Sequence, residues 1–136
     1  MPQIKNIYLG ELRTECHHLR SGKKFITDAP LDNKGKGEAF SPTDTVCAAL
    51  ASCIMTIMGI VAERESLDLK GMEALTTKIM TSEPPRKIKE IQIFLTIPTH
   101  LTLSEKQKQI LKHAAHTCPV ALSIHPDIIQ NITFNF

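Results

Sequence analysis

The sequence has no tryptophan and only one tyrosine and five phenylalanines among its 136 residues. So few aromatic rings leave little material for a platform on which nucleic-acid bases stack. Lysine and arginine total 16 against 14 acidic residues, and no basic cluster is longer than Lys23-Lys24 or Arg86-Lys87. The chain therefore lacks the basic patch typical of nucleic-acid binding, and we expect no nucleic-acid partner.

The N-terminus has no apolar run flanked by a cleavage site, which argues against secretion and favours a reducing cytoplasm. The chain also lacks the spacing of a zinc ribbon or a CxxC motif, because its cysteines stand at positions 16, 47, 53 and 118. In a reducing compartment such cysteines are typically free thiols, redox groups or ligands rather than a structural disulfide framework.

What is present indicates one α+β domain over residues 1–136. A mass of 15.1 kDa with 42% hydrophobic and 22% charged residues is typical of a globular domain. The apolar patterns and breakers predict two or three antiparallel strands in 3–28, a long helix over 41–65, a hairpin over 72–82 and 86–97, helices after Ser104 and Thr117, and a closing strand from Ile132. Strands, helix, hairpin, helices and strand without a repeated βαβ unit define an α+β plan.

The long helix has the clearest start and the most unusual body. Ser41 is the predicted N-cap, Pro42 occupies the first helical position, and no charged residue occurs over 46–62. A membrane span is disfavoured, because Ser52 and Thr56 interrupt the run and the rest of the chain has the pattern of a soluble protein. One sheet covers one flank of such a helix, so we expect a second copy of the chain to cover the other and form a homodimer.

Cys53 and Cys118 are the candidate reactive thiols. Cys47 and Cys53 are six residues apart on one helix and cannot pair with each other, and each alone is typical of a buried helix. Cys118 precedes Pro119 at a predicted helix start, where free N–H groups lower the pKa of a thiol. A rival reading is a metal site made by His113, His116, Cys118 and His125, although such histidines are more often solvated or core groups.

Two motifs resemble the OsmC/Ohr family of osmotically induced and organic-hydroperoxide-resistance thiol peroxidases. The first is the segment 37–53, in which Pro42 opens the helix and Cys53 follows eleven residues later. The second is 116–120, which places Cys118 after an interval similar to the family's own. The resemblance covers nearly the whole chain. It implies an OsmC-like fold, with antiparallel sheets wrapped around long central helices in an intertwined homodimer, and no cofactor.

The resemblance also implies a reaction. Cys53 would attack an organic hydroperoxide and form a sulfenate, Cys118 would condense with it to a disulfide, and a lipoyl-type dithiol or small thiol would reduce that disulfide. An arginine of the N-terminal strands would stabilise the Cys53 thiolate; Arg13 is the better match and Arg20 the reserve.

One position departs from the family pattern. At the position where the family has the acidic residue that holds the arginine, this chain has Thr43, with Asp44 beside it. The alternative function is therefore a redox-sensing or ligand-binding module of the same fold, without efficient turnover.

Overall fold

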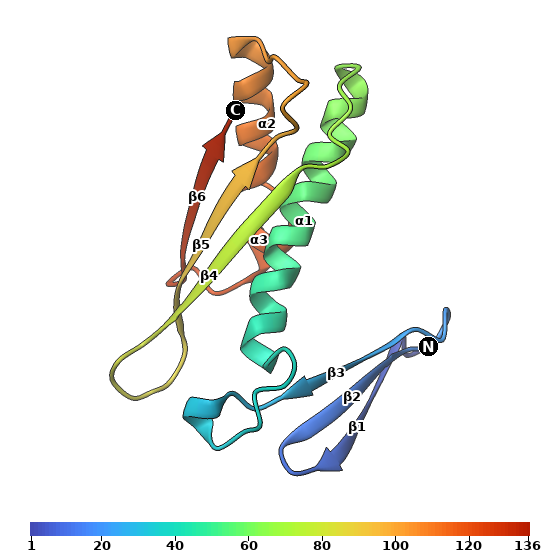
Figure 1. Ribbon diagram of the computed structural model, residues 1–136, viewed down its shortest axis with the longest axis vertical. Coiled ribbons are helices and arrows are strands. Elements are labelled where there is room, and N and C mark those ends of the chain that lie inside the picture. Colours follow the sequence, from blue (N-terminus) through green and yellow to red (C-terminus); the bar gives the residue numbers. More distant parts are fainter. The chain divides into compact units, whose positions relative to one another are not determined.

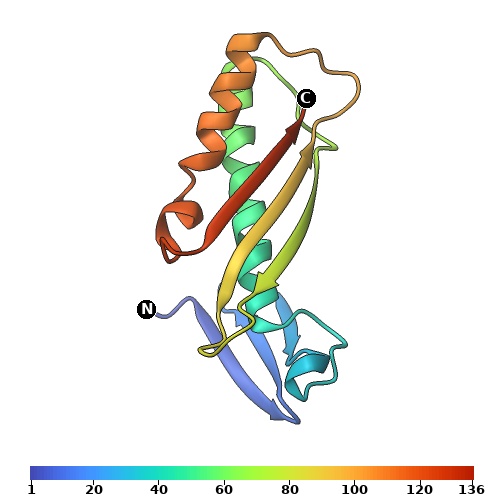
Figure 2. The ribbon, with the colours of Figure 1, turned by 90° about the vertical axis from the view of Figure 1, so that its left-hand side faces the viewer.

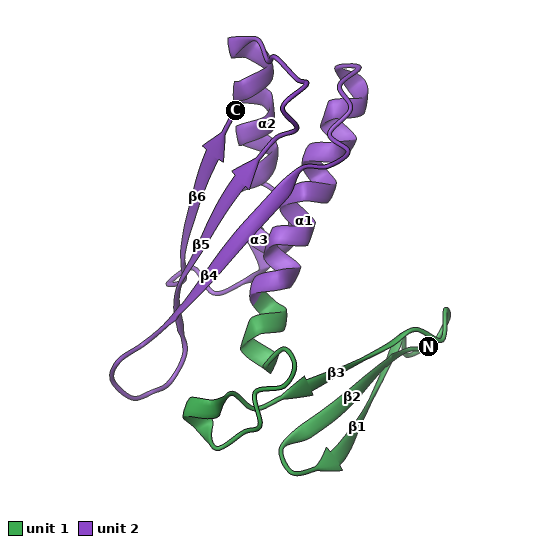
Figure 3. Ribbon diagram, viewed as in Figure 1, with its two compact units in different colours: residues 1–46 green, residues 47–136 purple.

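The computed structural model describes all 136 residues, which form two compact units, 1–46 and 47–136. Each unit has its own three-stranded sheet, and the division falls within the first turns of the long helix (Figures 1 and 3). The mixed composition of helices and sheets confirms the predicted α+β class.

The first unit is an antiparallel sheet in the order β1-β2-β3. Its strands are β1 (Ile4–Gly10), β2 (Arg13–His18) and β3 (Lys24–Asp28), as the sequence predicted for 3–28. A loop with one short 3-10 helix, η1 (Leu31–Asn33), leads from β3 to the long helix. The register of β2 and β3 places Arg13 opposite Asp28, which decides the environment of the candidate arginine.

The long helix α1 (Pro42–Arg64) confirms the predicted helix and its start. Asp44 donates its N–H to Ser41 Oγ at 3.0 Å, and the Ser41 N–H donates to Asp44 Oδ2 at 2.9 Å. These reciprocal bonds form a capping box, because the first N–H groups of a helix have no partner within it.

One face of α1 is buried and the opposite face is not. The buried positions recur every three or four residues: Cys47, Leu50, Ala51, Ile54, Met58 and Ala62. Ile60 remains 45% exposed, so one chain does not cover the helix on all sides, and the second copy stays a prediction. By length and composition α1 is also apolar enough to cross a membrane, but core helices of soluble proteins pass the same test.

The second unit carries a sheet in the order β4-β5-β6, with α1 and α2 against one of its faces (Figure 2). The predicted hairpin is β4 (Glu73–Met80) and β5 (Ile88–Thr96), and alternate β5 residues Ile91, Ile93 and Leu95 are almost fully buried. β6 (Ile129–Asn135) pairs with β5 in parallel, so the prediction of purely antiparallel sheets is wrong at this pairing. A parallel neighbour needs a long crossover, which α2 and α3 supply here.

Two helices in that crossover bring the second cysteine to α1. α2 (Glu105–His116) begins at Ser104 with a capping box to Gln107, and α3 (Pro119–Ser123) follows Cys118 directly. Gln130 of β6 donates from Nε2 to the Ala121 carbonyl oxygen at 2.9 Å, which ties α3 to the sheet. The position of Cys118 is thus fixed from both α2 and β6.

Candidate dithiol site

The second unit brings together two thiols that are 65 residues apart in the sequence. Cys53 lies in the middle of α1 and is partly buried, whereas Cys118 is fully buried at the start of α3. The Val120 N–H donates to Cys53 Sγ at 3.5 Å, and the Ala121 N–H donates to Cys118 Sγ at 3.4 Å. Successive backbone N–H groups of one short helix therefore hold both sulfur atoms.

Local sequence explains this arrangement. Cys118 is the N-cap of α3 and its sulfur takes the place of the usual capping oxygen. Pro119 is suited to the first position, since it has no N–H to satisfy and its φ is already helical. The first free N–H of the helix is then that of Val120, which donates to a sulfur on another helix. This gives Cys53 a donor that its position in mid-helix could not supply.

The surroundings of Cys118 oppose the ionisation of its thiol. Burial above all raises the pKa of the Cys118 thiol, and the neighbouring Cys53 thiol raises it further. The Ala121 and Val120 N–H groups act in the opposite direction but do not outweigh burial. The expectation that a helix start lowers the pKa of Cys118 is therefore wrong. Near neutral pH, Cys118 is held as the protonated thiol.

Arg13 lies in the first unit, clamped by a buried carboxylate. Its Nε donates to Asp28 Oδ1 at 2.7 Å and its Nη2 to Asp28 Oδ2 at 2.8 Å, while Glu38 lies at 3.6 Å from Nη2. Asp28 is only 1% exposed and also accepts the Glu38 N–H. Such a bidentate pair fixes the plane of the guanidinium, which a lysine could not reproduce. The approach of Arg13 to Cys53 stays a prediction.

The Arg13–Asp28 pair identifies the carboxylate that holds the arginine in this chain, where Thr43 stands at the acidic position of the family. Asp28 of β3, which was not predicted from the sequence, holds the arginine, and Asp44 forms the capping box of α1. Arg20, the reserve candidate, is exposed in the turn between β2 and β3. Arg13 is thus the candidate with a fixed guanidinium, despite the departure from the family pattern at Thr43.

The Arg13–Asp28 pair should make the free energy of unfolding fall at acidic pH. The Arg13 guanidinium holds the pKa of Asp28 below its ordinary value, so the folded state binds that proton less readily than the unfolded chain does. The resulting stability is complete above the unfolded pKa of about 3.9 and is lost as the pH falls through the folded pKa. We expect Asp28→Asn to flatten the fall in unfolding free energy as the pH drops below about 4.

Denaturant unfolding at several pH values measures this slope. Asp68→Asn is the matched control, because Asp68 is an exposed residue whose side chain accepts only a local backbone N–H. The control should keep the pH dependence of the original chain. An equal flattening in both variants would show that Asp28 has no special share in it.

The remaining candidates do not assemble into a metal centre. No group of three or more His, Cys, Asp and Glu side chains is placed to hold a metal ion. His113 and His116 lie on α2, and the His125 Nδ1 accepts the Asp127 N–H. Together with Cys118 they do not make the four-ligand site considered from the sequence, so that reading is wrong.

A family model described as OsmC-like protein matches residues 35–132, well over half of the chain and including both candidate thiols. The chain belongs to the OsmC-like family. None of the curated proteins matches it significantly.

Solved structures extend the similarity over the full length of this OsmC-like protein. It is 47% identical to a protein of Psychrobacter arcticus 273-4 described as an osmotic-stress-induced and detoxification-response protein, with a TM-score of 0.94 and coverage of 99% of this chain and 96% of that one. An organic hydroperoxide resistance protein OsmC from Legionella pneumophila has 18% identity, a TM-score of 0.75 and coverage of 98% and 95%. At 18% identity, the similarity to the Legionella pneumophila protein shows the fold alone.

A groove next to the dithiol site was not anticipated from the sequence. It has a volume of about 570 Å³ and lies between α1 and α2. Ile57, one turn after Cys53, and Thr117, next to Cys118, lie at its end near the thiols. The other lining residues are Val61, Arg64, Glu65, Gln109, Ile110, His113 and Ala114. The lining of the groove combines apolar side chains with the charged groups of Arg64 and Glu65.

Proposed function

We propose that this OsmC-like protein is a thiol-dependent peroxidase that reduces organic hydroperoxides. The observation that carries the proposal is the meeting of Cys53 and Cys118 at the start of α3, with a backbone N–H on each sulfur. Two thiols from distant parts of a chain, one partly exposed and one buried, are what a peroxidatic and a resolving cysteine require. The family of the chain supports the same class of chemistry.

The chemistry assigns a different role to each thiol. The Cys53 thiolate attacks the O–O bond, the bond breaks, and Cys53 sulfenic acid and an alcohol are formed. The Cys118 thiol then condenses with the sulfenic acid, which forms the disulfide and releases water. A lipoyl-type dithiol or a small thiol then returns both cysteines to the reduced state by thiol–disulfide exchange. Because burial keeps Cys118 protonated, it is suited to the second step rather than to the first.

The surroundings of the thiols favour an alkyl hydroperoxide over hydrogen peroxide. Ile57, Val61 and Ile110 line the groove that begins beside the dithiol site. Each methylene group of a substrate that is buried there stabilises the complex by about 0.8 kcal/mol. Hydrogen peroxide has no group that gains from such a surface.

We also propose that the working form is a homodimer. The face of α1 opposite its buried stripe carries Ile60 and is uncovered in one chain. A helix with no charge over 46–62 is most stable when a second copy removes this face from water.

Mass spectrometry under non-reducing conditions tests the proposed reaction. One equivalent of cumene hydroperoxide should lower the mass of the reduced protein by two hydrogens, and peptide mapping should place the new bond between Cys53 and Cys118. Cys47, on the same helix but buried, is the internal control and should stay reduced. A disulfide that joins other cysteines, or no mass change, would contradict the proposal.

A further inference from the structure

Gln130 is a polar residue on the apolar face of β6. Alternate residues of this strand point to the buried face of the sheet: Gln130, Ile132 and Phe134. Gln130 pairs with Ile91 of β5, which has no exposed surface. An amide in such surroundings is costly unless it is hydrogen-bonded, so its partner shows what the residue does there.

The partner of the Gln130 amide is the backbone of α3. Gln130 Nε2 donates to the Ala121 carbonyl oxygen at 2.9 Å. The carbonyl groups in the last turn of a helix lack a partner within the helix, so this amide takes the place of a backbone donor. The side-chain bond from Ser123 Oγ to the Pro119 carbonyl oxygen, at 2.7 Å, stays within α3. Gln130 thus connects α3 to the sheet.

Ala121 links this bond to the two sulfur atoms. Its N–H donates to Cys118 Sγ at 3.4 Å, and the N–H of the preceding residue, Val120, donates to Cys53 Sγ at 3.5 Å. A helix of five residues has no stability of its own, so the orientation of α3 depends on its contacts with the rest of the chain. Gln130 therefore acts on both sulfur atoms through one short stretch of backbone.

We propose that Gln130 is a positioning residue for disulfide formation, an inference that rests on the proposed peroxidase function. In this step the Cys118 sulfur attacks the sulfur of the Cys53 sulfenic acid. The S–S bond forms, the S–O bond breaks, and the hydroxyl group leaves with the Cys118 proton as water. The attack depends on the alignment of the two sulfur atoms, so a small displacement of α3 slows it.

Gln130→Met tests this role, because it keeps the length of the side chain and removes the donor. Without a reductant, the Cys53 sulfenic acid either condenses with Cys118 or is oxidised by a second hydroperoxide to the sulfinic acid. Mass spectrometry gives the concentration of cumene hydroperoxide at which half of Cys53 becomes the sulfinic acid. We expect this concentration to fall about tenfold in Gln130→Met. Partial unfolding would reduce the amount of reacting protein without shifting this concentration.

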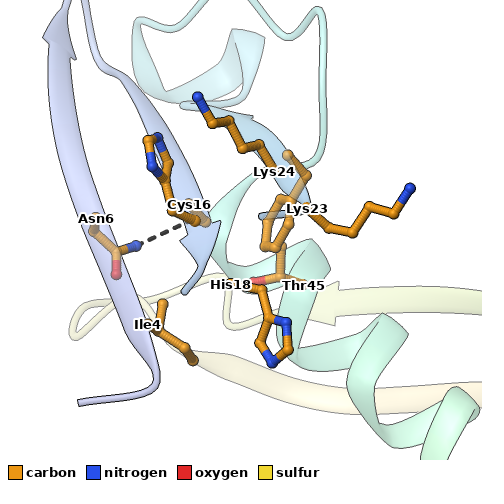
Figure 4. A pocket seen from close by; sticks show the side chains of 9 residues that line it. Ile4, Asn6, Cys16, His18, Lys23, Lys24 and Thr45 are labelled. Atoms are coloured by element: carbon orange, nitrogen blue, oxygen red, sulfur yellow. Dashed lines mark hydrogen bonds between the residues drawn. The ribbon is translucent and has the colours of Figure 1, made fainter. Parts of the chain in front are cut away.

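Two variants that remove other amides are the controls. Gln92 lies on β5, points to the opposite face of the sheet from Gln130, and donates to Glu90. Asn6 of the first unit donates from Nδ2 to Cys16 Sγ at 3.1 Å, in the wall of a cavity (Figure 4). Gln92→Met therefore removes an amide from the same sheet, and Asn6→Leu removes one from a thiol outside the pair. Both should behave as the original chain does. An equal shift in Gln92→Met, or no shift in Gln130→Met, would overturn the proposal.

A second measurement does not depend on hydroperoxide. Buffers of reduced and oxidised glutathione give the equilibrium constant for the disulfide between Cys53 and Cys118. Positioning raises the effective concentration of one thiol at the other, so this constant should fall about tenfold in Gln130→Met, which raises the reduction potential by about 30 mV. If the original chain does not react with hydroperoxide, the peroxidase function is wrong, and an unchanged glutathione equilibrium in Gln130→Met would then overturn the role of Gln130 as well.

Discussion

Replacement of Cys53 by serine should lower hydroperoxide consumption by about a thousandfold or more, as expected when the nucleophile of a covalent mechanism is removed. The serine hydroxyl is not ionised near neutral pH and does not form the equivalent of a sulfenic acid. The Val120 N–H still has an oxygen to bond, so the local fold is kept. Stopped-flow measurement of the reaction with cumene hydroperoxide, with a dithiol reductant present, gives the rate.

Cys118→Ser should behave differently from Cys53→Ser. It should turn over once and then stop, because the sulfenic acid has no resolving thiol and a second equivalent of hydroperoxide oxidises it to the sulfinic acid. Cys47→Ala is the control on the same helix and should keep the rate of the original chain. Full activity in Cys53→Ser, or an equal loss in Cys47→Ala, would end the peroxidase proposal.

Much of the fold was predicted from the sequence because its signals are local. Ser41, Pro42 and Asp44 mark the start of α1 through capping rules that depend on four neighbouring residues. The same holds for Ser104 and Gln107 at α2, where the capping box is complete. The parallel pairing of β6 was missed because register between distant strands has no such local signal.

The candidate site, like the fold, was predicted only where the sequence signal is local. The positions of Cys53 and Cys118 in their motifs identified both thiols, but two properties depend on contacts through space. The raised pKa of Cys118 comes first from burial, which outweighs the helix start that the sequence displays. The carboxylate on Arg13 comes from Asp28, fifteen residues away on a neighbouring strand. A buried acidic residue needs a partner, so the alternation of β3, which ends at Asp28, could have indicated this pairing.

Arg13→Ala should slow the reaction of Cys53 with hydroperoxide by about a hundredfold, comparable to the loss of one preorganised electrostatic group in an enzyme. In the proposed mechanism the guanidinium stabilises the thiolate and the negative charge that develops on the leaving oxygen. Arg20→Ala is the matched control, because Arg20 lies exposed in the turn of the same sheet. The thiolate absorbance of Cys53, followed against pH in a variant that lacks the other three cysteines, reports the effect independently of turnover.

Asp28→Asn separates the orientation of Arg13 from its charge. The guanidinium remains, but the bonds at 2.7 Å and 2.8 Å can no longer form as a charged pair, and the side chain samples more conformations. We expect a loss of about tenfold, between that of the control and that of Arg13→Ala, with thermal unfolding used to confirm that each variant is folded. If Arg20→Ala loses the activity and Arg13→Ala does not, the reserve arginine stabilises the thiolate. If neither variant slows the reaction, neither Arg13 nor Arg20 stabilises the Cys53 thiolate, and that part of the proposed mechanism is wrong.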